Sequence, residues 1–70
     1  MNATCVYVDG PFANCNGDDE FPEWTISFQD DDGHDHGESW VCTTFEAAVA
    51  YGQSLAKTRK LELVIEAVRA

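Results

Sequence analysis

The side chains with the clearest capacity for chemistry stand in one short run, His34, Asp35 and His36. On an extended chain residues i and i+2 point to the same side, so the two imidazoles could bind one metal ion together with nearby aspartates. A calcium loop of the EF-hand type is excluded, because Gly33 at its sixth position would place Phe28 at the first ligand position. The alternative is a solvated turn whose geometry Asp and Gly supply. We expect this turn, with no metal and no other cofactor.

The three cysteines, Cys5, Cys15 and Cys42, show no C-x-x-C spacing. An odd number of thiols without a recognisable secretion signal predicts reduced cysteines. Cys5 and Cys42 lie in strand-like runs and are expected to be small core residues. A nucleophilic pair of Cys42 with His36 can be drawn, but nothing in the sequence aligns the two side chains.

Other catalytic patterns are absent from the sequence. It contains no glycine-rich phosphate loop, no nucleophile elbow and no H-E-x-x-H pair. A chain of 70 residues also leaves little room for a ligand pocket of ordinary size. The sequence therefore predicts a protein that is not an enzyme.

The distribution of charge is the most distinctive feature of the chain. Four basic residues face thirteen acidic ones, which gives a net charge of −9. Ten of the acidic residues lie between positions 9 and 38, where no Lys or Arg occurs, and all four cations lie from position 57 onward. This balance excludes a nucleic-acid binder of the usual basic kind and an anionic membrane surface as partner. A basic protein surface is the complementary partner.

Two interpretations of the acidic residues stay open. Acidic loops keep a small protein soluble, although interspersed charges of both signs would serve as well. Alternatively, carboxylates about 6.6 Å apart along a strand imitate the charge spacing of a nucleic-acid backbone and are steered into a basic groove. The residues that we expect at such a contact are Asp18, Asp19, Glu20, Asp30, Asp31, Asp32, Asp35 and Glu38.

Hydrophobic periodicity predicts the elements that position these loops. Strands are expected at residues 4–8, 23–29, 38–42 and 61–68, and a helix at residues 43–58. Gly10 and Pro11 should end the first strand and open a long loop. The helix carries apolar or small residues on one stripe and a capping box of Thr43 with Glu46. The stripe consists of Phe45, Ala48, Val49, Gly52, Leu55 and Ala56.

These elements predict a single α+β domain over residues 1–70. In the order β-β-β-α-β, they form a four-stranded, mostly antiparallel sheet with the helix on one face and the final strand parallel to the third. The expected core is Trp24, Ile26, Phe28, Trp40, Phe45, Val49, Leu55, Leu61, Leu63 and Ile65. The other face should present Thr25, Ser27, Val41 and Val64 with Glu62 and Glu66, open to a partner or a second copy. We expect a monomer or a homodimer.

The location of the protein is also predicted from its sequence. The N-terminal residues lack a cationic region followed by a long apolar run, and no apolar run approaches the ~20 residues that a membrane span needs. We therefore expect a soluble, cytoplasmic protein that does not bind a membrane.

The acidic loops and the compact helix resemble those of small inhibitors that phages and mobile elements encode against host defence, of the anti-CRISPR and anti-restriction types. The residues that carry this resemblance are Asp18-Asp19-Glu20, Asp30-Asp31-Asp32 and Asp35, with the helix from Thr43. It implies a protein that blocks nucleic-acid binding by a CRISPR effector or a restriction enzyme without catalysis and without binding nucleic acid itself.

The alternative is a metal-responsive or antitoxin-type regulatory module. Phe21-Pro22-Glu23 resembles the F-P-D element of antitoxin domains with a strand–strand–strand–helix–strand core, although the Leu-Pro-Gly that follows in those domains is absent.

Overall fold

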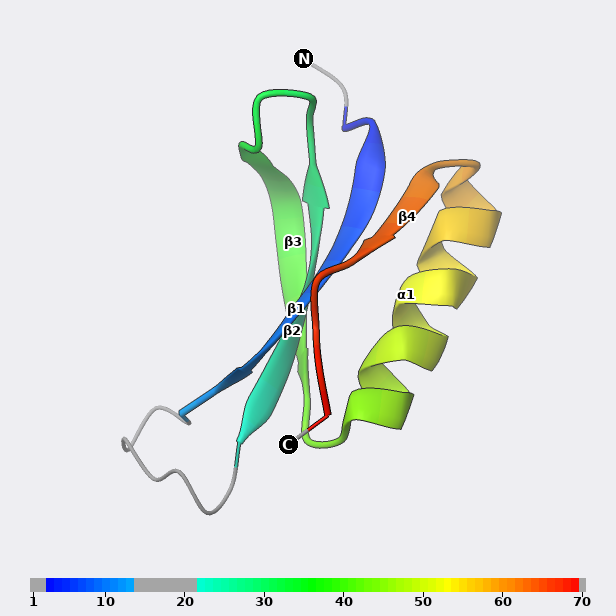
Figure 1. Ribbon diagram of the computed structural model, residues 1–70. Helices are drawn as coiled ribbons and strands as arrows, with labels where there is room; N and C mark the ends of the chain where they lie inside the picture. The colour runs from blue at the N-terminus through cyan, green and yellow to red at the C-terminus, as the bar shows by residue number, and fades with distance from the viewer. Residues whose placement is uncertain (1–2, 14–21, 70) are drawn as a thin grey trace.

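A computed structural model describes residues 3–13 and 22–69 of the chain (Figure 1). These residues form β1 (Cys5–Phe12), β2 (Glu23–Gln29), β3 (Asp35–Cys42), α1 (Phe45–Arg59) and β4 (Glu62–Ile65). The strands make one sheet in the order β3-β2-β1-β4, in which β1 to β3 are antiparallel neighbours and β4 runs parallel to β1. The predicted α+β class and the order of elements are confirmed.

Strand β1 lies in the interior of the sheet and provides two of its fully buried side chains. Val6 and Val8 are fully buried, and β1 pairs with β2 on one side and with β4 on the other. The predicted core omitted both valines. The crossover through α1 carries the chain from β3 past β2 and β1 to the far edge of the sheet. Strand β4 therefore shares the direction of β3, as predicted, but β2 and β1 lie between the two.

Strand β1 continues beyond the point where Gly10 and Pro11 were expected to end it. It reaches Phe12, which pairs with Glu23, and an irregularity in the register between Asp9 and Phe12 accommodates the two intervening residues. Gly10 has a φ of 131° and lies so close to Trp24 that a Cβ atom at this position would clash with the indole ring. Glycine therefore permits the irregularity, and the predicted end of the strand is wrong.

The helix begins one residue later than the capping box predicted. Thr44 is the N-cap, and its hydroxyl oxygen accepts a hydrogen bond from the backbone N–H of Ala47 at 3.1 Å. Thr43 is therefore not the cap. Lys60 ends the helix in the left-handed conformation, and its backbone N–H faces the carbonyls of the last turn.

The predicted helix stripe is confirmed. Its six residues are the buried or half-buried positions of α1, and the remaining helix residues are exposed. Figure 1 shows α1 lying on one face of the sheet. At Gly52 the helix backbone lies so close to β1 that an added Cβ atom would stand 2.6 Å from Cγ2 of Val8 and 3.3 Å from Cδ1 of Leu63.

Most of the predicted core is found in place. Trp24 and Ile26 are buried, and Phe28, Trp40, Phe45, Leu55, Leu61 and Leu63 pack half-buried around them. The prediction that Ile65 belongs to the core is wrong. This residue is 41% exposed, because its strand lies at the edge of the sheet and has a neighbour on one side only. Beyond β4 the chain follows β1 as far as Val68, whose N–H donates to the carbonyl of Gly10, and Ala67 joins the core.

The close contact at Gly52 gives a stability prediction. Gly52→Ala should gain up to about 1 kcal/mol of helix propensity but lose more, because overpacking a rigid buried valine costs about 1–3 kcal/mol. We expect a net loss that lowers the Tm by several degrees, measured by thermal unfolding. Ser54→Ala on the exposed side of α1 is the control and should leave the Tm unchanged or raise it. An equal rise for Gly52→Ala would show that the helix does not press on β1.

Candidate partner-binding surface

The hairpin tip (residues 30–38) comprises the turn between β2 and β3 and the first residues of β3, and Asp30 organises the turn. Its carboxylate Oδ1 accepts hydrogen bonds from the backbone N–H groups of Asp32 at 2.9 Å and His34 at 3.0 Å. The carbonyl of Asp30 also accepts from the N–H of Gly33 at 3.0 Å, and Gly33 has the positive φ that this turn requires. The turn is therefore held by hydrogen bonds to the side chain and the backbone of one residue, Asp30.

Asp30 was predicted to be a solvated contact residue, but the structure shows that it is buried. The residue is only 6% exposed, because its carboxylate turns inward to the backbone of the tip. A sequence of three consecutive aspartates does not reveal which one caps the turn. The residue before the two turn positions is the favoured place for such a cap, and this is the signal that could have identified it.

The other described acidic residues of the hairpin tip are exposed. Asp31 accepts a hydrogen bond from the hydroxyl of Thr4 at 3.0 Å, and Asp35 accepts one from the side-chain amide of Gln29 at 3.1 Å. Asp32 and Glu38 are exposed as well. The predicted contact residues Asp18, Asp19 and Glu20 lie outside the described residues.

Strand β3 begins at Asp35, three residues earlier than predicted. The register with β2 shifts between Ser27 and Gln29, and Gly37 adopts a φ of 78° at this irregularity. Asp35 and Glu38 therefore lie on the edge strand of the sheet and not in a free loop. This gives their backbone a fixed support, while their side chains stay in water.

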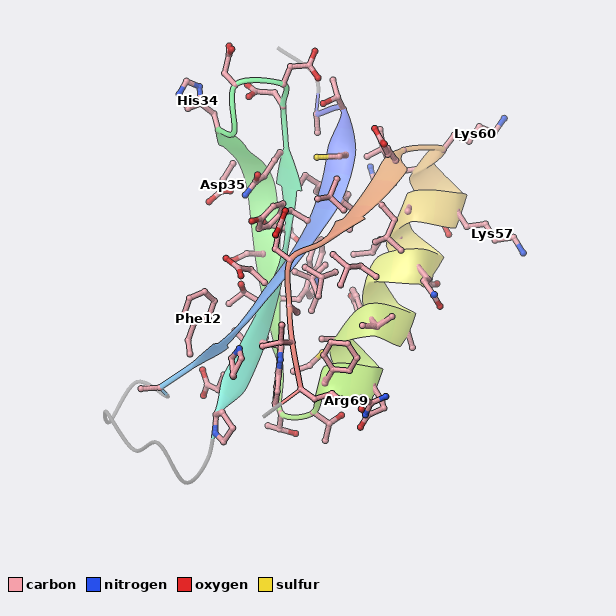
Figure 2. All side chains as sticks on the ribbon, in the orientation of Figure 1. Phe12, His34, Asp35, Lys57, Lys60 and Arg69 are labelled. Atoms are coloured by element: carbon pink, nitrogen blue, oxygen red, sulfur yellow. The ribbon has the colours of Figure 1, made fainter. Side chains whose placement is uncertain are left out.

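The two lysines lie away from the hairpin tip (Figure 2). Figure 2 shows Lys57 and Lys60 at the end of α1, on the opposite side of the molecule from His34 and Asp35. The guanidinium of Arg59 stands 5.4 Å from the ring centroid of Phe28, in cation–π geometry. Among the described residues, no Lys or Arg forms an ion pair with the four exposed carboxylates of the tip, which are those of Asp31, Asp32, Asp35 and Glu38.

Arg69 is engaged at the other end of the helix. Its guanidinium stands 4.8 Å from the ring centroid of Phe45 and forms an ion pair with Glu46. Both aromatic contacts, that of Arg59 and that of Arg69, therefore hold the cations on the side of the sheet that α1 covers.

A possible set of metal ligands stands at the hairpin tip. Asp30, Asp32 and His34 each place one ligand atom within 4.8 Å of the others, and Nδ1 of His34 lies 3.9 Å from Oδ2 of Asp30. The metal alternative considered from the sequence paired His34 with His36, whose side chain lies outside the described part of the structure. Because Oδ1 of Asp30 is already bonded to two backbone N–H groups, the turn has an internal support that does not depend on an ion.

This internal support predicts that chelation does not change the stability of the domain. If an ion held the tip, its binding free energy would contribute to the free energy of unfolding, and removing it would lower the Tm. We expect melting curves recorded with and without EDTA, and with added zinc, to superimpose. A fall of several degrees in EDTA would instead identify Asp30, Asp32 and His34 as a structural metal site.

The same turn predicts unequal roles for neighbouring aspartates. Asp30→Ala removes two charge-assisted hydrogen bonds and should cost about 1–3 kcal/mol of stability, whereas Asp32→Ala should change it by less than about 0.5 kcal/mol. Asp30→Asn keeps an acceptor oxygen and should lie between them. Urea unfolding measures all three. Equal effects of the two alanine substitutions would contradict the assigned role of Asp30.

The described thiols offer no activated nucleophile. Cys42 packs against the core, as predicted, and is not disulfide-bonded. Cys5 is also unpaired, but it lies on the sheet face opposite the helix. Burial raises the pKa of Cys5, and the nearby negative charge of Glu62 raises it further, so the thiol stays protonated at neutral pH. Cys15 is outside the described residues.

Two surface clefts of the described residues are smaller than ordinary ligand sites. One has a volume of about 230 Å³ and is lined by Ala3, Phe28, Arg59 and Leu61. The other, beside Thr44 and Arg69, has about 260 Å³. Both fall below the range of roughly 300–1,000 Å³ that is usual for small-molecule pockets.

The one described helix is not long and apolar enough to cross a membrane. Comparison of the chain with protein families, with curated proteins and with solved structures finds no match in any of the three. The resemblance to phage-encoded inhibitors stays a prediction.

Proposed function

We propose that this protein is a non-enzymatic inhibitor or adaptor of the cytoplasm that binds a basic, nucleic-acid-binding surface of another protein. The observation that carries the proposal is the segregation of charge. The hairpin tip, whose backbone is held by hydrogen bonds, carries four exposed acidic residues, and no described Lys or Arg forms an ion pair with them. These residues are Asp31, Asp32, Asp35 and Glu38. Asp30 shapes this tip from within.

The geometry of the tip supports binding more than mere solubility. Solubility needs charges but no fixed arrangement of them. Here the backbone under the carboxylates is fixed by the hydrogen bonds of Asp30 and by the edge strand β3, so less conformational entropy is lost when a partner binds. Pairing with Lys or Arg in a groove is worth on the order of 1–3 kcal/mol for each fully desolvated pair, and much less at the rim.

The partner class follows from the same chemistry. A groove that binds nucleic acid is lined by Lys and Arg, and an acidic chain can compete for it by imitating the phosphate charges. A CRISPR effector or a restriction enzyme, as the target of a phage or mobile element, fits this description. Competition at such a groove requires no catalysis by the inhibitor.

The second candidate is a metal-responsive regulatory module, which the placement of Asp30, Asp32 and His34 favours. The two functions differ in their response to solution conditions. Binding through charge weakens steeply as salt rises, whereas binding that depends on a metal ion is abolished by a chelator at constant salt.

The proposed function predicts strong effects of charge at the tip. The probe is a fluorescent arginine–glycine repeat peptide, and its affinity is measured by anisotropy at increasing salt. The double variant Asp31→Lys, Asp32→Lys should bind well over tenfold more weakly with an unchanged Tm, because exposed substitutions seldom alter stability. The wild-type chain should also displace a DNA duplex from the peptide.

Two variants at the helix end provide the control. Lys57→Ala and Lys60→Ala remove cations that lie far from the tip in Figure 2 and should leave the affinity within about twofold. An affinity that is independent of salt, or a tip variant that binds like the wild type, would contradict the proposed function.

A further inference from the structure

The face of the sheet opposite α1, here called the uncovered face, is not packed against any element of the described residues. The strand registers place Tyr7, Ser27 and Ser39 in one row across it, with Val64 beside Tyr7. Figure 1 shows α1 on the other side of the sheet and no second layer here among the described parts.

The uncovered face has an uncharged centre with exposed apolar groups. Phe12 is 46% exposed and Val41 56% exposed, while Tyr7 and Val64 are half-buried. Figure 2 shows the ring of Phe12 directed away from the helix. Apolar side chains that gather on one face of a small protein are typical of a contact surface.

Carboxylates surround this centre. Asp9 and Glu66 lie near Tyr7: desolvation raises the pKa of the tyrosine above its ordinary value, and both negative charges raise it further. The registers place Glu23, Asp35 and Glu62 on the same face. The four cations of the chain belong to residues 57–69, and Arg59 and Arg69 are held against aromatic rings on the helix side.

The charge and the size of the face decide between possible occupants. A second copy of this chain would set carboxylates against carboxylates, which is costly. Four strands about 4.8 Å apart and some six residues long, with a rise of about 3.3 Å per residue, cover roughly 400 Å². A stable interface buries about 800 Å² per partner, so the face needs an adjoining surface. The hairpin tip, which continues β2 and β3, is that surface.

We infer that the uncovered face is the centre of the partner-binding surface, and that its occupant is a protein surface with apolar groups surrounded by Lys and Arg. This inference rests on the proposed function and extends it from the tip to the sheet. The tip then supplies salt-dependent attraction at one end of the interface. The centre supplies the desolvated contact that distinguishes one basic partner from another.

Two serines allow a matched test. Ser39→Arg places a cation and added bulk on the uncovered face, and Ser54→Arg makes the same change on the exposed side of α1. The probes are an arginine–tryptophan and an arginine–glycine repeat peptide of equal length and charge. We expect the wild type to prefer the tryptophan peptide, Ser39→Arg to bind it about tenfold more weakly, and Ser54→Arg to bind it within about twofold of the wild type.

A further variant tests the apolar centre directly. Val41→Ser replaces an exposed side chain and should reduce the preference for the tryptophan peptide, with an unchanged affinity for the glycine peptide. Thermal unfolding of each variant verifies that the fold is retained.

The outcomes separate this inference from the proposed function. If only the double variant Asp31→Lys, Asp32→Lys weakens binding, while Ser39→Arg behaves like Ser54→Arg, the uncovered face is not the interface and the proposed function stands. If the wild type does not prefer the tryptophan peptide, the apolar centre is likewise refuted. If the wild type binds neither peptide, both proposals fail together.

Discussion

The close contact of α1 with β1 is the constraint on which the rest of the structure depends. Val6 and Val8 are fully buried because the helix backbone at Gly52 lies directly over them. A short chain has apolar residues for one core layer only, so the single described helix covers one face of the sheet and no other described element covers the second face. The architecture thereby produces two unlike surfaces from one small domain.

Charge follows this division of the surfaces. The helix side holds Arg59 and Arg69 against aromatic rings, whereas the hairpin tip and strands β1, β2 and β3 carry acidic residues and no Lys or Arg among the described residues. A random arrangement of thirteen acidic and four basic residues would mix the signs more evenly. The segregation produces a field of one sign around the uncovered face, which attracts basic surfaces and disfavours self-association.

The sequence predicts the helix and the strands better than the residues at which they begin and end. Regular alternation located β2 correctly, and the helix stripe is confirmed, because both depend on periodic burial. The predicted ends are wrong where a local contact decides them. Thr44 and not Thr43 caps the helix, and β1 continues through Gly10 beyond its expected end. The candidate site shows the same limit. The tip was located from its composition, but the inward turn of Asp30 depends on backbone geometry that composition does not reveal.

Heteronuclear NMR tests the central claim, that the acidic side of the sheet is the binding surface, most directly. The labelled chain is titrated with the arginine–tryptophan peptide, and the backbone amide shifts are followed residue by residue. The account predicts that the shifts concentrate at the hairpin tip and along β1 and β3, and that they diminish as salt rises, while the exposed residues of α1 stay unchanged. Shifts that concentrate on α1, or that scatter evenly over the chain, would contradict it.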